Sequence, residues 1–400
     1  MHFREQIIFE SGNESNFRIP TIITTNSGTL LAFCNDRKNT LADHADVTTV
    51  AMARKKAGGE WEKSCEISGF GDWAYRIGSA VYDDISGKTI VFIQHIPTTT
   101  NEFKQYTEAE KLDIKRRADK ARSSAEAFGV REGWFTLTST DDGETFEESP
   151  LKLSTGEREK YATEAFMLGC ASTHGSAHGI RLRHGTHAGR ILCPARTFTR
   201  EYNTWDGLRE CGYNTAIYSD DRGTSWKLSG CVQVATGEGT LIERGDGSIL
   251  YNSRAYLKDG KRYLAISNDG GATFSYAGTD PFLKEEIKIG CNASFIRVEL
   301  DQIKDTSLLP DGAQDITLFC NPRSDTRRNM SICVSFDAGK SWSFAKSVCE
   351  GPCAYSSLVF EPISQRFYLI YERGKDAIEK NPYSAGICAA EFDIEWLMSK

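Results

Sequence analysis

Histidine and cysteine are the residue types whose spacing could form a metal site in this chain. Two histidine pairs have ligand-like spacing, His174 with His178 and His184 with His187. Both pairs lie in a glycine-rich stretch that predicts strands and turns, so no helix brings the paired rings onto one face. The 12 cysteines form no C-x-x-C pair. We therefore expect loop histidines, no metal site and no cofactor.

The cysteines also bear on the redox environment of the chain. Several lie inside apolar, strand-like runs (LLAFC, RILCPA and LFCNP), where a free thiol behaves as a small buried hydrophobe. The first residues, MHFREQIIFESGNES, lack the apolar stretch of a signal peptide. These features favour reduced thiols over disulfides. We expect a cytoplasmic protein, or a secreted one from which a signal peptide has been removed.

The overall charge limits the classes of ligand. The net charge of −7 argues against broad nucleic-acid binding, which needs a basic surface. A small anionic ligand needs only a local cluster of arginines, because a guanidinium keeps its charge and holds a carboxylate through two hydrogen bonds. Hydrophobic residues make up 40% of the chain, enough for a large core. No apolar run approaches about 18 residues, so we expect no membrane-spanning helix.

A repeated turn indicates which elements must position any site. The pattern S-x-D-x-G-x-[TS]-[FW] occurs as STDDGETF at 139–146, SDDRGTSW at 219–226, SNDGGATF at 267–274 and SFDAGKSW at 335–342. Such a sequence between strand-like runs predicts a hairpin, in which the aspartate accepts backbone N–H groups and the glycine supplies a positive φ. Repeated hairpins with a periodic glycine and aromatic residue indicate a β-propeller.

One insertion interrupts this pattern at residues 103–128, FKQYTEAEKLDIKRRADKARSSAEAF, which is rich in helix formers. Thr107 and Glu110 form a capping-box pattern near its start. The basic residues between Lys111 and Arg122 could attract an anionic partner, but the interleaved acids favour a solvated face. With no linker and no low-complexity segment, we expect one all-β domain over residues 1–400 that carries this short helical insertion.

The segment NFRIPTI at residues 16–22 resembles the motif near the start of sequences of the sialidase (neuraminidase) superfamily. The four turns that follow it resemble the turns that are called Asp boxes in this family. The resemblance extends over nearly the whole chain and keeps the same order. It implies a six-bladed β-propeller that acts as an exo-α-sialidase of the bacterial type and releases terminal sialic acid from glycans. Asp boxes also occur in non-catalytic propellers, so each catalytic position needs its own match.

Three arginines from different blades bind the substrate carboxylate in this family. By resemblance, Arg18 in FRIP is the first and Arg254 in SILYNSRAY is the second. The third lies before the last Asp box, in TRRNMSICVSFDAGKSW, where Arg327 takes the family position two residues before Asn329. Arg328 remains an alternative, because neighbouring residues of a strand point to opposite faces.

The family uses a tyrosine as nucleophile, and EGPCAYSSL at 350–358 resembles its G-x-x-AYSDL motif, which assigns Tyr355. A neutral tyrosine avoids the repulsion that a carboxylate nucleophile would meet from the substrate's own carboxylate. A phenol with a pKa near 10 is a poor nucleophile without a base. The resemblance assigns that base to Glu238 in TGEGTLIERGDGSILYNSR. Glu243 is five residues further on, and this odd spacing points only one of the two toward the site.

Further residues complete the implied site. In bacterial sialidases an aspartate follows an arginine by six residues; Asp43 follows Arg37 at that distance, and Asp46 matches a second aspartate of the motif. The resemblance makes Asp43 the acid that protonates the leaving oxygen and then activates water. It places Arg37 near the C4 substituent of the sugar. Glu372, in the segment IYE, would hold Arg18 in place.

One departure from the family concerns the sugar. Gly78-Ser79, in RIGSAVYD, stands where sialidases commonly have Asn-Pro or Asp-Pro near the C4–C5 side. A related 2-keto-3-deoxy acid, such as Kdn or Kdo, carries the same anomeric carboxylate and is an alternative to sialic acid. Transglycosylation in place of hydrolysis is another alternative, and so is a non-catalytic, glycan-binding propeller. In every case the expected partner is a glycan that bears such an acid.

Overall fold

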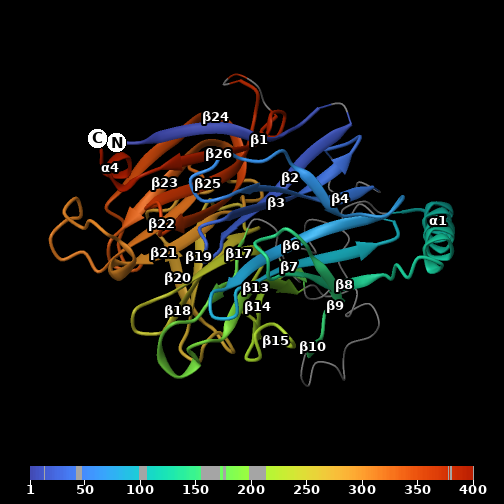
Figure 1. Cartoon of the computed structure of the whole chain (residues 1–400), viewed down its shortest axis with the longest axis horizontal. Helices are drawn as coiled ribbons and strands as arrows, with labels where there is room; N and C mark the ends of the chain where they lie inside the picture. Colours follow the sequence, from blue (N-terminus) through green and yellow to red (C-terminus); the bar gives the residue numbers. More distant parts are fainter. Residues whose placement is uncertain are drawn as a thin grey trace.

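The computed structural model of the chain describes residues 1–12, 14–41, 47–98, 106–154, 172–173, 177–197, 213–376, 378 and 381–399. Nearly all of its regular structure is antiparallel β-sheet, which confirms the predicted all-β class. In Figure 1 the two termini lie side by side at one edge of the molecule, and helix α1 stands at the opposite edge.

The strands form successive antiparallel units along the chain. One unit contains β2 to β5 and the next contains β6 to β9, and a short parallel contact between Thr48 and Ala74 joins the two in one sheet. A third unit is built on β13 and β14, and a fourth contains β17 to β20. The strands of these four units are β2 Ser15–Thr24, β3 Leu30–Lys38, β4 Thr48–Lys55, β5 Cys65–Ser68, β6 Ala74–Asp83, β7 Lys88–Ile96, β8 Gly133–Ser139, β9 Glu147–Pro150, β10 Leu153–Ser154, β11 Ser172–Thr173, β12 Ile180–Arg181, β13 Ile191–Thr197, β14 Tyr213–Ser219, β15 Trp226–Leu228, β16 Gln233–Val234, β17 Thr236–Glu243, β18 Ile249–Ala255, β19 Arg262–Ser267 and β20 Ser275–Asp280.

The long strand β24 (Phe344–Glu361) belongs to two units. Its first half, up to Pro352, pairs with β23, and its second half, from Cys353 onward, pairs with β25. The same sheet continues on one side to β21 and on the other side to β26 and β1. The first strand of the chain is therefore the edge strand of the last unit. The remaining bounds are β1 Phe3–Glu10, β21 Ser294–Glu299, β22 Asp315–Pro322, β23 Arg328–Ser335, β25 Arg366–Arg373, β26 Gly386–Phe392 and α4 Ile394–Met398.

The four Asp boxes join paired strands: β8 to β9, β14 to β15, β19 to β20 and β23 to β24. In the third copy, Asp269 accepts the N–H of Thr273 at 2.9 Å and its hydroxyl at 2.6 Å, while the Gly271 N–H donates to Ser267 Oγ at 2.8 Å. The other three copies make the same set of bonds. The predicted hairpins and the roles of their aspartates are confirmed.

Each box also lies against the unit before it. A Cβ added to Gly271 would lie 2.6 Å from a methyl group of Leu192 in β13, and one added to Gly143 would lie 2.8 Å from Leu31 in β3. Because Gly271 also has a φ of 86°, the position needs glycine both for its backbone angle and for this close approach. The boxes therefore hold neighbouring units together as well as turning the chain.

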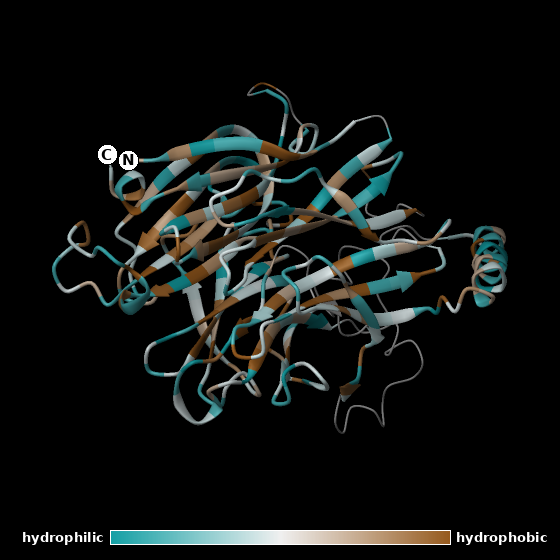
Figure 2. Ribbon diagram, in the orientation of Figure 1, coloured by the Kyte–Doolittle hydropathy of each residue, from teal (hydrophilic) through white to brown (hydrophobic). Residues whose placement is uncertain are grey.

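Helix α1 (Glu108–Glu126) confirms the predicted insertion and its capping box. The Glu110 N–H donates to Thr107 Oγ1 at 3.3 Å, and the Thr107 N–H donates to Glu110 Oε2 at 2.8 Å. Four of its basic side chains pair with acids of the same helix, as Lys111 does with Glu108 at 2.7 Å. Figure 2 shows α1 mostly in hydrophilic colours, in agreement with the predicted solvated face. Among the described helices, none has the length and apolar character to cross a membrane.

Replacing Gly271 by alanine should destabilise the fold more than the same change at Gly278. Both glycines have positive φ, 86° and 95°, so each alanine meets backbone strain of about 1–2 kcal/mol. Only the Cβ at Gly271 meets a neighbour, since nothing lies within 4 Å of one at Gly278. Overpacking against Leu192 should add about 1–3 kcal/mol. Urea denaturation measures both losses, and equal losses would show that the turn does not pack tightly on Leu192.

Candidate active site

Tyr355, in the second half of β24, is the centre of a buried polar cluster. Its hydroxyl donates to Glu238 Oε1 at 2.7 Å and accepts a hydrogen bond from Arg254 Nη1 at 2.7 Å. Arg254 Nη1 also donates to Glu238 Oε2. All three residues are buried, with 6%, 9% and 4% of the surface of Tyr355, Glu238 and Arg254 exposed. A phenol, a carboxylate and a guanidinium thus form one hydrogen-bonded triangle that is shielded from water.

Three guanidinium groups surround the ring of Tyr355. The Cζ atoms of Arg18, Arg254 and Arg327 lie 5.7, 5.8 and 5.5 Å from the ring centroid. Arg18 is paired with Glu372 at 2.6 Å, and Arg254 is paired with Glu238. Of these five charged groups three are positive and two are negative, so the cluster favours an additional anion.

An irregular stretch of backbone aims Arg18. The register of β2 against β3 shifts between Arg18 and Thr21, and Ile19 has a φ of 62°. This angle is rare for a β-branched residue and costs about 1–3 kcal/mol. Glu372 compensates, because its Oε1 accepts both Arg18 Nε at 2.6 Å and the Ile19 N–H at 2.9 Å. Pro20 has no N–H to leave unpaired, which gives the Arg-Ile-Pro sequence a structural reason.

Register shifts also occur at two other residues of this cluster. Glu238 lies within the shift of β17 against β18, and Tyr355 lies within the shift of β24 against β25. A bulge redirects a side chain that regular alternation would place on another face. The site is therefore assembled where the inner strands depart from regular pairing.

Two of the arginines rest on the same short segment before β21. Arg254 Nε donates to the carbonyl oxygen of Ile289 at 2.8 Å, and Arg327 Nη2 donates to that of Gly290 at 3.1 Å. This segment is the KIGCNASFI stretch. Its backbone carbonyls fix the orientation of both guanidinium planes.

The geometry favours Arg327 over Arg328 as the third arginine. Arg327, just before β23, places its guanidinium beside the Tyr355 ring. Arg328 begins β23 and pairs through its backbone with Pro352.

Burial raises the pKa of Tyr355 well above its ordinary value; Arg254 and Arg327 oppose this shift, and Glu238 adds to it. The phenol is therefore protonated near neutral pH, and the Glu238 carboxylate accepts its hydrogen bond. Cys291 packs against Tyr355 in the same cluster. Burial raises the pKa of this thiol to about 12 although two arginines lie nearby, so the thiol adds no charge to the site.

Three further predicted residues belong to β3 and to the sequence that follows it. Arg37, on β3, is buried and its Nη1 donates to the carbonyl oxygen of Leu41 at 2.8 Å. Asp43 and Asp46 follow directly but lie outside the described residues, so their roles remain predictions.

Glu243, the alternative base, lies at the other end of β17. Its carboxylate accepts the backbone N–H groups of Arg183 at 2.6 Å and His184 at 2.9 Å. As predicted, only one of the two glutamates reaches Tyr355, and it is Glu238.

Tyr383 is a residue of this cluster that the sequence did not reveal. Its hydroxyl accepts a hydrogen bond from Arg327 Nη1 at 2.7 Å, and its ring lies 3.6 Å from the Cζ atom of Arg18. It belongs to the connection between β25 and β26, in the sequence NPYSAG, which matches no repeat and no motif. The Asn-Pro pair predicts a turn there, but no local signal predicts this contact.

The antiparallel units and their Asp boxes define the class as a β-propeller-like protein. Residues 28–365 match the family described as the BNR repeat-like domain. The chain belongs to this family and is a member of the sialidase superfamily.

The similar proteins agree with this placement. A sialidase of Micromonospora viridifaciens is 28% identical over 99% of this chain and 54% of that protein. A sialidase of Bacteroides fragilis is 27% identical over 83% of this chain and 55% of that protein. The intramolecular trans-sialidase of Ruminococcus gnavus, solved in complex with oseltamivir carboxylate, shares the fold with a TM-score of 0.72 at 17% identity, over 98% of both chains. The chain spans about half the length of these two curated relatives.

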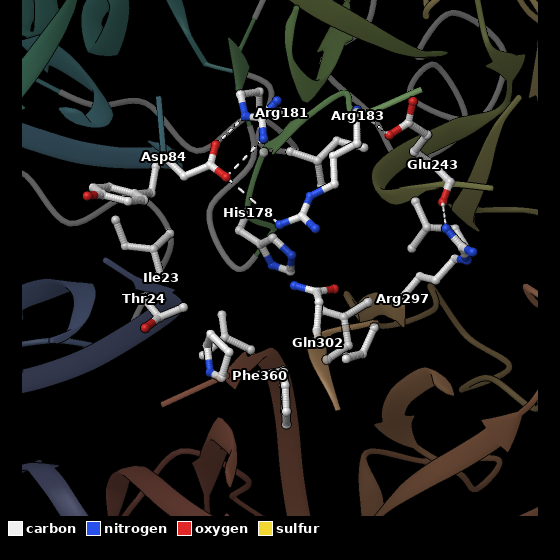
Figure 3. A pocket seen from close by; sticks show the side chains of 18 of the residues that line it. Ile23, Thr24, Asp84, His178, Arg181, Arg183, Glu243, Arg297, Gln302 and Phe360 are labelled. Carbon is white, nitrogen blue, oxygen red and sulfur yellow. Dashed lines mark hydrogen bonds and ion pairs between the residues drawn. The ribbon is translucent and has the colours of Figure 1, made fainter. Parts of the chain in front are cut away.

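Figure 3 shows a separate cavity and the side chains that line it. Its volume is about 330 Å³, and it lies at the opposite ends of the inner strands. Its lining includes Ile23, Glu243 and Phe360, which lie at the far ends of the strands that carry Arg18, Glu238 and Tyr355, and none of the predicted site residues. Its charged side chains pair with one another, as Arg181 does with Asp84 at 2.9 Å. This cavity is therefore separate from the cluster around Tyr355.

His178 lines this cavity and should make stability depend on pH. Burial lowers the pKa of its imidazole from 6.5 to about 4. As the pH falls from 6.5 to 4, the unfolded chain therefore binds a proton that the folded chain does not. The free energy of unfolding should fall across this window by up to about 1.4 kcal/mol per pH unit, and this effect should level off below it.

Urea denaturation at several pH values between 7 and 4 measures this effect. In His178→Gln the contribution should disappear, whereas His187→Gln, a change on a neighbouring turn, should keep it. An unchanged pH dependence in His178→Gln would contradict the assignment.

Proposed function

We propose that this chain is an exo-α-sialidase that hydrolyses terminal α-linked sialic acid with retention of configuration. The observation that carries the proposal is the 2.7 Å hydrogen bond between the hydroxyl of Tyr355 and Glu238, inside a cluster of three arginines. The curated sialidase relatives support it. We also propose that the antiparallel units close into a six-bladed propeller, in which β1 completes the last blade.

The three arginines would hold the carboxylate of the sugar. Planar guanidinium groups bind a carboxylate through paired, charge-assisted hydrogen bonds. Arg18, Arg254 and Arg327 provide three such groups around one ring. An acid fixed by them places its anomeric carbon, which bears the carboxylate, close to the hydroxyl of Tyr355.

In the first step the oxygen of Tyr355 bonds to the anomeric carbon while the glycosidic bond breaks. The phenolic proton passes to Glu238, and the leaving oxygen takes a proton from an acid, a role that we assign to Asp43. Arg254, which donates to the Tyr355 oxygen, stabilises the negative charge that develops there. In the second step water replaces the Tyr355 oxygen, gives its proton to Asp43, and the phenol recovers its proton from Glu238.

The same mechanism could act on more than one sugar acid as substrate. A 2-keto-3-deoxy acid such as Kdn or Kdo would meet the same arginines. The departure at Gly78-Ser79 lies in β6, within a register shift against β7. The Ser79 hydroxyl donates to the carbonyl oxygen of Pro194 at 3.3 Å, so this side chain is engaged with a neighbouring strand.

A panel of fluorogenic α-glycosides tests the proposal. The protein should release the fluorophore from the sialoside faster than from the Kdn and Kdo analogues. Tyr355→Phe and Glu238→Gln should each lower kcat by roughly 10²–10⁴-fold, since one removes the nucleophile and the other its base. Proton NMR should show the α-anomer as the first product.

Two other outcomes would contradict the proposal. Binding of all three sugars without turnover would establish a glycan-binding protein, and sialyl-lactose formed with added lactose would establish transglycosylation.

The pair Arg327 and Arg328 provides a matched test of the arginine cluster. Arg327→Lys should raise KM about 10- to 100-fold with a smaller change in kcat, because lysine keeps the positive charge but cannot make the bidentate contact of a guanidinium to the substrate. Arg328→Lys, one residue away and half-buried at the start of β23, should leave both constants within about twofold, because Arg327 still lies beside the Tyr355 ring. Steady-state kinetics on the preferred glycoside measures both, and a larger effect at Arg328 would exchange the two assignments.

A further inference from the structure

Tyr383 lies on the connection that leaves the active-site end of β25. Glu372, the partner of Arg18, stands near the end of that strand. The Tyr383 N–H donates to Asn381 Oδ1 at 3.0 Å, and its carbonyl oxygen accepts from Gly386 N–H at 3.1 Å. Its backbone is thus tied at both ends of a turn, and its side chain has a defined direction.

The side chain spans two of the three arginines from different units. Its hydroxyl takes a hydrogen bond from Arg327 Nη1 at 2.7 Å, and its ring centroid lies 3.6 Å from the Cζ atom of Arg18. Tyr383 also packs on the cluster formed by Tyr355, Ala354 and Cys291. A guanidinium against a ring face is attracted by the quadrupole of the ring. One residue therefore fixes the position of two cations that would otherwise repel each other.

We propose that Tyr383 is a positioning residue that holds Arg18 and Arg327 in the arrangement that receives the substrate carboxylate. This inference rests on the function proposed above. Arg327 is then held on two sides, by Tyr383 at Nη1 and by the Gly290 carbonyl at Nη2. These two contacts use two of its five N–H donors, and the others remain for a ligand.

The same contact could instead block the site, like a plug. In that case the Tyr383 phenol would occupy the place of the substrate carboxylate and would have to leave before substrate binds. The geometry favours positioning. The ring of Tyr383 lies close over the Arg18 guanidinium, whereas a carboxylate binds at the edge of a guanidinium, in its plane. A plug would also predict tighter binding once the side chain is removed, which is the opposite of the effect expected here.

The experiment measures kcat and KM with the fluorogenic sialoside and the Kd of free sialic acid by calorimetry. Tyr383→Phe keeps the ring over Arg18 and loses the bond to Arg327; it should raise KM and Kd about tenfold, with kcat within about twofold. Tyr383→Leu also loses the ring and should raise both by about a further fivefold. Tyr276→Phe, at an exposed tyrosine on β20, is the matched control and should change nothing.

A double-mutant cycle shows whether Tyr383 acts through Arg327. In an Arg327→Met background, Tyr383→Phe should have no further effect on Kd. Equal losses in both backgrounds, unchanged Kd in Tyr383→Phe, or tighter binding would each overturn the inference. The isosteric Tyr383→Phe keeps the test valid if Tyr383→Leu fails to fold. If the unaltered protein neither cleaves nor binds the panel of acids, the proposed function itself fails; if it binds them and Tyr383→Phe binds equally, only the role of Tyr383 fails.

Discussion

The structure depends on holding three guanidinium groups around one phenol, largely away from water. Charges in such a place repel one another strongly and are costly to bury unless they are paired and hydrogen-bonded. The protein meets this constraint with Glu372 beneath Arg18, Glu238 beside Arg254, and backbone carbonyls beneath Arg254 and Arg327. One positive charge is left over among these groups, and that surplus is what an anionic ligand would neutralise. The sheets serve to bring these partners, remote in the sequence, to one point.

The predictable part of the fold is local. The hydrogen bonds of a turn such as SNDGGATF all form within eight residues, so the sequence pattern predicts the hairpins. The capping box in the same way predicts where α1 begins. The residues around Tyr355 have no local signal. The sequence around Tyr355 alone predicts an ordinary tyrosine of a strand. Its position in the site was predicted only because the motifs of the family occur in the same order along this chain. Tyr383 escaped even this, because its contacts join a connection near the end of the chain to Arg18 near its start.

Backbone irregularity is the second feature that the sequence pattern did not foresee. Simple alternation assigns each residue of a strand to one of two faces, yet Arg18, Glu238 and Tyr355 all stand at register shifts. The strained angle at Ile19 persists because Glu372 binds its N–H and the side chain of its neighbour together. The regularly paired strands make the molecule rigid. The register shifts between strands determine the direction of the polar side chains in the cluster.

The shared strand β24 has a consequence for how the molecule can open. Its 18 residues run without interruption from the outer edge of one unit to the inner position of the next. Moving one unit relative to the other would therefore bend a strand that both units share. Tyr355 lies in the inner half of this strand, so its setting is coupled to the integrity of both units. Amide protons around Tyr355 should accordingly exchange with solvent only through large-scale unfolding, so the proposed nucleophile lies in the part of the fold that is last to loosen.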